Sequence, residues 1–246
     1  RLMDALMGDP AQHFDLQIIR SWRNAMQFWA VECSLNGKYS GLDGVDSGSY
    51  FGPGIALNAV PTGFKCSSLH LVVPVALSHA GWVAIELRRR LGARIPKLVL
   101  LDWIVMEAPP PFLGALQSLQ DPAQWQQTRE QLFSMWLRGL DIPALTHYVR
   151  EDMGSYPFEM WTRAGREISA AYAKDGSPFQ ALASLDPPMP VLHLYAQPDD
   201  PRYLAAQRSF GAAHPWFQAS RLEARSHFPM YEVPDEMVMA IERFAA

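Results

Sequence analysis

The chain has 246 residues, of which 49% are hydrophobic and 19% charged, a composition typical of a globular protein with a full buried core. Its net charge of -4 argues against a nucleic-acid partner, and no apolar run reaches the ~18–20 residues of a membrane span. Its two cysteines, Cys33 and Cys66, fit a reducing compartment better than a disulfide scaffold, so we expect a cytoplasmic protein without membrane partners.

Three apolar runs in the first part of the chain predict buried strands. They occupy residues 14–19, 71–77 and 97–102, and a helix-like segment over 81–91 separates the second run from the third. Strands that alternate with helices in this way are typical of a parallel sheet. The sequence therefore predicts an α/β protein.

The pattern changes after Trp103, because residues 104–187 contain no convincing strand. Four helical segments are predicted there, near 111–120, 122–139, 142–153 and 158–174. Asp121-Pro122 resembles an N-cap followed by a first-turn proline, which places the start of the second helix at that point. We interpret 104–187 as a helical cap inserted into a core that is formed by 1–103 and 188–246.

After this insertion the alternation of strand and helix resumes. Strands are predicted over 191–196 and 219–223, and helices over 201–213 and 234–244.

The segment Ala76-Leu77-Ser78-His79-Ala80-Gly81 lies between a predicted strand and a predicted helix. A serine flanked at two residues' distance by small residues, at a sharp strand-to-helix turn, is the nucleophile elbow of the α/β-hydrolase fold. Ser78 would stand exposed at the carboxyl edge of the sheet, under a helix N-terminus that favours negative charge. We therefore expect an α/β-hydrolase fold, a mostly parallel sheet with a helical cap inserted between strands.

A base for this site is predicted in Ser226-His227-Phe228-Pro229, the loop between the last strand and the last helix. Histidine accepts and returns a proton near neutral pH, and a carboxylate commonly fixes its tautomer. Two positions compete for that acid: Asp102 at the end of one strand, and Asp199 or Asp200 after the next. The residues alone leave this choice open.

The other histidines carry weaker signals. His79 either contacts a ligand or only stabilises the helix that follows it, whereas His70, His147, His193 and His214 are expected to be structural or exposed. His13-Phe14-Asp15 fits half of an iron site, but no third ligand can be placed, so no metal is expected.

Several stretches together resemble the cofactor-independent 3-hydroxy-4(1H)-quinolone 2,4-dioxygenases, a branch of the α/β-hydrolase fold. The resemblance covers about residues 71–246. It rests on Ser78-His79-Ala80-Gly81-Trp82, Leu101-Asp102-Trp103, Trp161-Thr162-Arg163-Ala164-Gly165-Arg166-Glu167, Gly176-Ser177-Pro178, Tyr195-Ala196-Gln197-Pro198, His214-Pro215-Trp216-Phe217 and Ser226-His227-Phe228-Pro229.

The resemblance implies ring cleavage by dioxygen without metal or flavin. In the family a histidine assisted by an aspartate removes the proton of the substrate's 3-hydroxyl group, and His227 and Asp102 match those positions. The anion reacts with dioxygen, and the ring opens to an N-acylanthranilate and carbon monoxide. Ser78 would then bind substrate rather than attack it, and His79, Trp161 and Leu77 would line the pocket. The expected partners are a 3-hydroxy-4-quinolone, with a 2-alkyl group from methyl to heptyl, and dioxygen.

The chain departs from the family at three points. Leu77 stands where some members carry a polar residue, and Ala80 replaces a common glycine. The His-Gly-Trp type segment of the family's oxyanion loop is not in the chain, and residues 24–70 match weakly, so the first strands of the core are expected to be missing. Two other functions remain open: a serine hydrolase (esterase or lactonase) with Ser78 as nucleophile, and a protein that binds flat aromatic molecules without catalysis.

Overall fold

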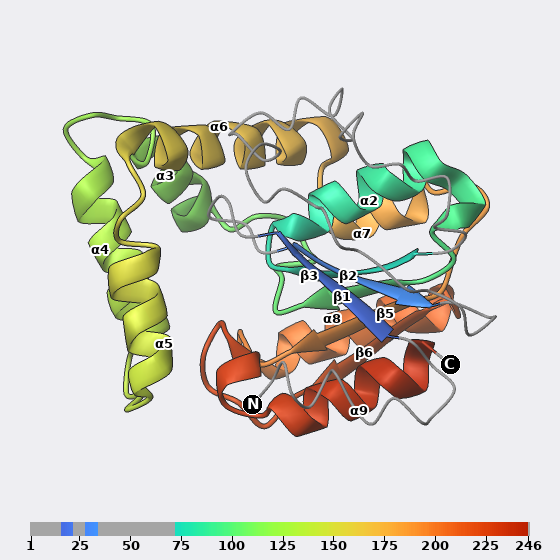
Figure 1. Ribbon diagram of the computed structural model, residues 1–246. Coiled ribbons are helices and arrows are strands. Elements are labelled where there is room, and N and C mark those ends of the chain that lie inside the picture. Colours follow the sequence, from blue (N-terminus) through green and yellow to red (C-terminus); the bar gives the residue numbers. More distant parts are fainter. Residues whose placement is uncertain (1–15, 22–27, 34–71, 246) are drawn as a thin grey trace, which may run out of the picture.

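A single twisted sheet organises the part of the chain that the computed structural model describes, residues 16–21, 28–33 and 72–245 (Figure 1). Its strands are neighbours in chain order: β1 (Leu16–Ser21), β2 (Phe28–Cys33), β3 (Val72–Leu77), β4 (Leu98–Leu101), β5 (Val191–Tyr195) and β6 (Phe217–Arg221). The pairs β1–β2 and β2–β3 are antiparallel, and every pair from β3 to β6 is parallel. The expected mostly parallel arrangement is therefore confirmed.

The strands predicted from apolar runs are present, with small shifts at their ends. Strands β3, β4 and β5 coincide with the predicted runs to within one or two residues, and β6 begins two residues earlier than expected. The described part of the predicted strand over 14–19 lies in β1, which continues to Ser21. Strand β2 has no counterpart among the strands predicted from the sequence.

Alternate residues of the central strands pack on opposite faces of the sheet, because successive side chains of a strand point to opposite sides. Helices α2 (Ala80–Leu91), α7 (Pro178–Ala183) and α8 (Pro201–Ala213) pack in one buried cluster with Ala76, Leu100 and Tyr195. Helix α9 (Pro234–Ala245) packs in another with Val75, Leu101 and Leu194. Figure 1 shows α2 and α7 on one side of the sheet and α9 on the other.

All the regular elements between β4 and β5 are helices. They are α3 (Pro110–Ser118), α4 (Trp125–Trp136), α5 (Pro143–His147), a π-helical turn (Tyr148–Asp152), α6 (Phe158–Asp175) and α7. Two short 3-10 helices lie outside this region, at Gly92–Arg94 after α2 and at Pro229–Tyr231 before α9. The helices predicted near 111–120 and 158–174 are confirmed. The division into a core and a cap stays a prediction.

Two of the helix predictions in this region were wrong in detail. The helix predicted from residue 122 begins at Trp125, because the Asp121 carboxylate accepts the Ala123 N–H at 2.8 Å and holds residues 122–124 in a turn. The single helix predicted over 142–153 is α5 followed by the π-helical turn, in which the Met153 N–H reaches back to the Tyr148 carbonyl at 2.9 Å.

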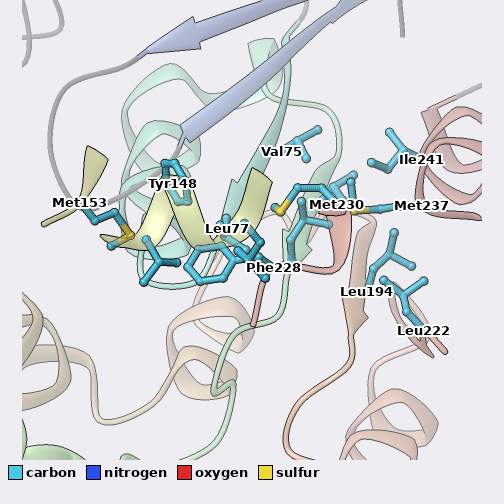
Figure 2. Close-up of a cluster of buried hydrophobic side chains, with 14 of the residues drawn as sticks. Val75, Leu77, Tyr148, Met153, Leu194, Leu222, Phe228, Met230, Met237 and Ile241 are labelled. Atoms are coloured by element: carbon cyan, nitrogen blue, oxygen red, sulfur yellow. The ribbon is translucent and has the colours of Figure 1, made fainter. Parts of the chain in front are cut away.

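A hydrophobic cluster extends from the face of the sheet that α9 covers to the helices between β4 and β5 (Figure 2). Leu77 at the end of β3 and Leu194 of β5 belong to it, together with Tyr148 of the π-helical turn and Met153, which directly follows that turn. Phe228, next to His227, packs edge-on against Tyr148 with ring centroids 5.7 Å apart. The cluster therefore fixes the helical region against the strand ends and the His227 loop.

None of the helices in the described ranges is long and apolar enough to cross a bilayer.

Candidate active site

Ser78 occupies a strained turn between β3 and α2. Its φ is 54°, in the left-handed region that non-glycine residues seldom adopt. Its N–H donates to the Leu101 carbonyl at 2.7 Å, and its carbonyl accepts the Gly81 N–H at 3.0 Å. Ala76 and Ala80, which flank the turn, are fully buried, so larger side chains would not fit there. This geometry is that of the predicted elbow.

Asp102 occupies a second strained turn at the end of β4, with a φ of 42°. Ser78 and Asp102 are the two non-glycine residues with positive φ in the described part of the chain. Their strands are parallel neighbours with Leu77 paired to Leu101, so both residues follow at the same edge of the sheet. Two strained backbones side by side mark this edge as a site where side-chain direction has been favoured over local stability.

His227 meets Asp102 at this edge. Its Nδ1 lies 2.7 Å from Asp102 Oδ2. The other carboxylate oxygen accepts two backbone N–H groups, from Ala196 at 2.6 Å and Gln197 at 2.8 Å. The Asp102 side chain is only 1% exposed, whereas that of His227 is 19% exposed. Because Nδ1 donates to the carboxylate, Nε2 is the nitrogen that is free to accept a proton.

The competing acids are occupied elsewhere. Asp200 begins α8 as its N-cap and accepts the Arg202 N–H at 2.8 Å, while Asp199 forms an ion pair with Arg221 at 3.0 Å. The structure therefore pairs His227 with Asp102, a choice that the residues alone left open.

Glu232 holds the loop that carries His227. Its Oε1 accepts the N–H of Ser226 at 2.7 Å and that of Arg225 at 3.1 Å. The Ser226 hydroxyl in turn accepts the Phe228 N–H at 3.0 Å. This role of Glu232 was not predicted from the sequence, although the residue follows His227 by only five positions.

His79 follows Ser78 and has a different partner from His227. The indole N–H of Trp103 donates to His79 Nδ1 at 3.2 Å. Phe112 of α3 stacks on the imidazole at 5.0 Å between centroids, and Tyr172 of α6 meets its edge at 6.0 Å. Burial among these rings, and secondarily the charge that His227 can carry, lower the pKa of His79 to about 3. His79 is therefore neutral at working pH.

The remaining predicted site residues are buried in the same region. Trp161 of α6 is 3% exposed and packs edge-on against Phe133 at 5.7 Å, and its indole N–H has no acceptor among the described residues. Leu77 is buried in the cluster of Figure 2. Trp136, which is not among the predicted site residues, stacks on the His227 ring at 5.6 Å with the planes 18° apart. No hydrogen bond joins the Ser78 hydroxyl to His227 within the described ranges.

His193 supports the turn from behind. It is fully buried on β5, its Nε2 accepts the Trp103 N–H at 3.3 Å, and its Nδ1 lies 2.6 Å from Gln207 Oε1. Burial lowers the pKa of His193 to about 4, despite the opposing effects of Gln207 and Asp102. The expectation of a structural role for His193 agrees with these contacts.

Among the described residues, no three His, Cys, Asp or Glu side chains gather into a group that could hold a metal ion. His70 and the His13-Phe14-Asp15 segment lie outside the described residues.

No protein-family model matches the chain. The 2-heptyl-3-hydroxy-4(1H)-quinolone dioxygenase of Mycobacteroides abscessus is 41% identical over 166 residues, which are 67% of this chain and 62% of that protein. A solved AqdC variant in complex with its substrate, from work on ring cleavage of the Pseudomonas quinolone signal, is 39% identical with a TM-score of 0.70. That match covers 73% of this chain and 68% of the solved chain. The chain belongs to the 3-hydroxy-4-quinolone 2,4-dioxygenase family.

Membership of the quinolone dioxygenase family confirms the resemblance seen in the sequence. The matched part of the chain spans 62% of the length of its M. abscessus relative. An esterase from Thermogutta terrifontis aligns with a TM-score of 0.55 and 20% identity, over 73% of this chain and 67% of that one. At this identity the likeness shows a shared fold alone, and the fold expected from the elbow, that of the α/β-hydrolases, is confirmed.

Proposed function

We propose that this protein is a dioxygenase that cleaves the ring of a 3-hydroxy-4(1H)-quinolone with a 2-alkyl substituent. The products are an N-acylanthranilate and carbon monoxide, which together contain all the atoms of substrate and dioxygen. The main observation that supports this proposal is the 2.7 Å contact between His227 Nδ1 and Asp102 Oδ2, because it leaves Nε2 of His227 to act as a base. The family of the chain supports the substrate class, and the heptyl group named for the M. abscessus relative supports a long 2-substituent.

In this proposal His227 and Asp102 form a catalytic dyad. His227 Nε2 takes the proton of the substrate's 3-hydroxyl group, and Asp102 holds the ring in the required tautomer and stabilises the imidazolium that results. Asp102 can do so because two backbone N–H groups occupy its other oxygen and fix its orientation. The substrate anion then supplies the electrons for dioxygen, with neither metal nor flavin.

Ser78, His79, Trp161 and Leu77 are the proposed substrate-binding residues. Ser78 would donate a hydrogen bond to the substrate, since its hydroxyl has no partner in the described part of the chain. Trp136 supplies a flat apolar surface against His227, and Trp161 packs against Phe133 in the same hydrophobic cluster. Apolar surface of this kind would exclude water from the reacting anion. Degradation of an alkylquinolone signal in the cytoplasm is the biological role that we infer.

The decisive experiment treats the protein with a chelator and then adds 2-heptyl-3-hydroxy-4(1H)-quinolone, with and without air. Carbon monoxide release and oxygen uptake are measured together. We expect equal amounts of both in air and neither under nitrogen. Turnover that disappears with the chelator and returns with a metal would contradict the cofactor-free mechanism, and binding without oxygen uptake would indicate a non-catalytic binder.

A serine hydrolase is the second candidate, and the strained elbow at Ser78 is the observation that favours it. The variant Ser78→Ala separates the two. A hydrolase that uses Ser78 as nucleophile should lose roughly a thousandfold or more of its activity. A dioxygenase in which Ser78 only donates a hydrogen bond should lose about tenfold. Hydrolysis of p-nitrophenyl esters by the unaltered protein, without oxygen uptake on the quinolone, would favour the hydrolase.

A further inference from the structure

Trp103 directs a hydrogen-bond donor at a ring nitrogen of His79. The indole nitrogen can only donate, so His79 Nδ1, at 3.2 Å, must accept and cannot carry a proton. In neutral imidazole the proton is then on Nε2. The contact therefore selects one of the two tautomers of His79.

Trp103 is itself held on several sides, so that its N–H has a fixed direction. The residue is 1% exposed. Its ring lies against the backbone of α2, where a Cβ built on Gly81 would come within 2.2 Å of ring atom Cζ3. Its backbone N–H donates to His193 at 3.3 Å, and its carbonyl accepts the Tyr203 hydroxyl at 2.6 Å. A rigid donor of this kind can select a tautomer because the Trp103 side chain does not have to move to form the hydrogen bond.

The imidazole of His79 is equally constrained, but its other nitrogen has no partner among the described residues. Phe112 stacks on one face at 5.0 Å and Tyr172 meets the edge at 6.0 Å, which fixes the plane of the ring. Nε2 has no hydrogen-bond partner in the described ranges, and it is not among the fully buried unpartnered atoms there. As far as the described residues are concerned, the Nε2–H group therefore remains available to a ligand.

We propose that Trp103 is a positioning residue that keeps His79 in the Nε2–H tautomer, so that His79 donates a hydrogen bond to a carbonyl or anionic oxygen of the bound ligand. The low pKa of His79 supports this, because the ring stays neutral and does not compete with His227 for the substrate's proton. The identity of the ligand rests on the proposed function, whereas the tautomer does not.

The proposal can be tested by comparing two variants, Trp103→Phe and its control Trp82→Phe. Trp82 of α2 packs edge-on against Trp103 at 5.1 Å, and its buried indole N–H has no acceptor among the described residues. Trp82→Phe and Trp103→Phe thus make the same chemical change in one aromatic cluster, but only Trp103→Phe removes a hydrogen bond. Nitrogen-15 NMR of the free protein reads the tautomer, with the His79 signals assigned by their loss in His79→Gln.

We expect a pyridine-type Nδ1 and a pyrrole-type Nε2 for His79 in the unaltered protein and in Trp82→Phe. Trp103→Phe should show a mixture of tautomers. It should also raise the Kd for 2-heptyl-3-hydroxy-4(1H)-quinolone, measured under nitrogen, about fivefold, while Trp82→Phe changes it less than twofold.

A protonated Nδ1 in the unaltered protein would overturn the proposal, and so would an unchanged tautomer in Trp103→Phe. An unchanged Kd in Trp103→Phe would overturn the donor role of His79. If Trp103→Phe does not fold, the spectrum of the unaltered protein still decides the tautomer. Failure of the proposed function appears separately, as binding of the quinolone without ring cleavage in air.

Discussion

His227 and His79 lie at the same edge of the sheet and have opposite kinds of partner. Each has its Nδ1 engaged, but His227 faces the carboxylate of Asp102 at 2.7 Å and His79 faces the indole N–H of Trp103 at 3.2 Å. An acceptor at Nδ1 leaves Nε2 unprotonated, as a base, whereas a donor at Nδ1 leaves Nε2 protonated, as a hydrogen-bond donor. The chemical role of a histidine is thus assigned by its neighbour.

Both partners come from one turn, since Asp102 and Trp103 are consecutive residues. The positive φ of Asp102 bends the chain at the end of β4, and the turn is then held by side chains from three other elements. His193 of β5 binds the Trp103 N–H, Tyr203 of α8 binds the Trp103 carbonyl, and Tyr172 of α6 donates to the Ile104 carbonyl at 3.1 Å. The strain at Asp102 is tolerated because these hydrogen bonds hold the backbone of the turn in this conformation.

Removal of the proposed base should have the largest effect. His227→Ala is expected to lower the rate of quinolone cleavage about a thousandfold, since general-base catalysis typically contributes 10²–10⁴-fold. Steady-state oxygen uptake measures this. His147→Ala is the matched control, because the His147 side chain is 69% exposed on α5, and this variant should retain full activity. Equal losses in the two variants would contradict the role of His227.

A methyl group placed against the Trp103 ring should destabilise the fold. Gly81→Ala places a Cβ 2.2 Å from the Trp103 ring, and overpacking of this kind costs about 1–3 kcal/mol of unfolding free energy. Denaturant titration measures the cost. Gly114→Ala in α3 is the control, because a Cβ there meets nothing within 4 Å, and alanine should stabilise that helix. Similar stability of both variants would mean that the Trp103 ring is not tightly held.

Acid should weaken the fold through His79 and His193, the two histidines in the described ranges whose pKa is lowered by burial. The pKa values of His79 and His193 fall from 6.5 when unfolded to about 3 and about 4 when folded. Below pH 6.5 the unfolded chain therefore binds more protons than the folded one, so stability present above that pH is lost as the pH falls towards 4. Denaturant titrations across this range should show a shallower pH dependence in His193→Asn, and parallel curves would contradict the burial of a neutral His193.

The smallest effect is expected at the alternative acid. Asp199→Asn removes an ion pair with Arg221 whose two side chains are 63% and 37% exposed, so its contribution to stability is small. Cleavage activity should stay within about twofold of the unaltered protein, in contrast to a large loss in Asp102→Asn. Parallel kinetic measurements on the two variants decide between the acids, and a large loss in Asp199→Asn would move the acid to the β5–α8 loop.

Local sequence patterns were sufficient for most of the fold. Strands β3 to β5 could be predicted from apolar runs, which are a property of consecutive residues. The elbow at Ser78 could be predicted from the small residues around it, because only small side chains fit beside so sharp a turn. Errors arose where a local signal had two outcomes. Asp121 capped a turn rather than a helix, and the helical segment predicted over 142–153 changed from α-helix to a π-helical turn.

The sequence by itself determined that this chain carries an elbow serine, a histidine after the last strand and a family pattern around both. The residues alone left open which carboxylate meets His227, although the family resemblance implied Asp102, and they did not show what the second histidine does. Those answers depend on residues far apart in the chain, since 125 positions separate His227 from Asp102 and 24 separate Trp103 from His79. Only the tertiary structure brings such groups within hydrogen-bond distance, and hydrogen bonds, which act over about 3 Å, then assign each ring nitrogen its proton.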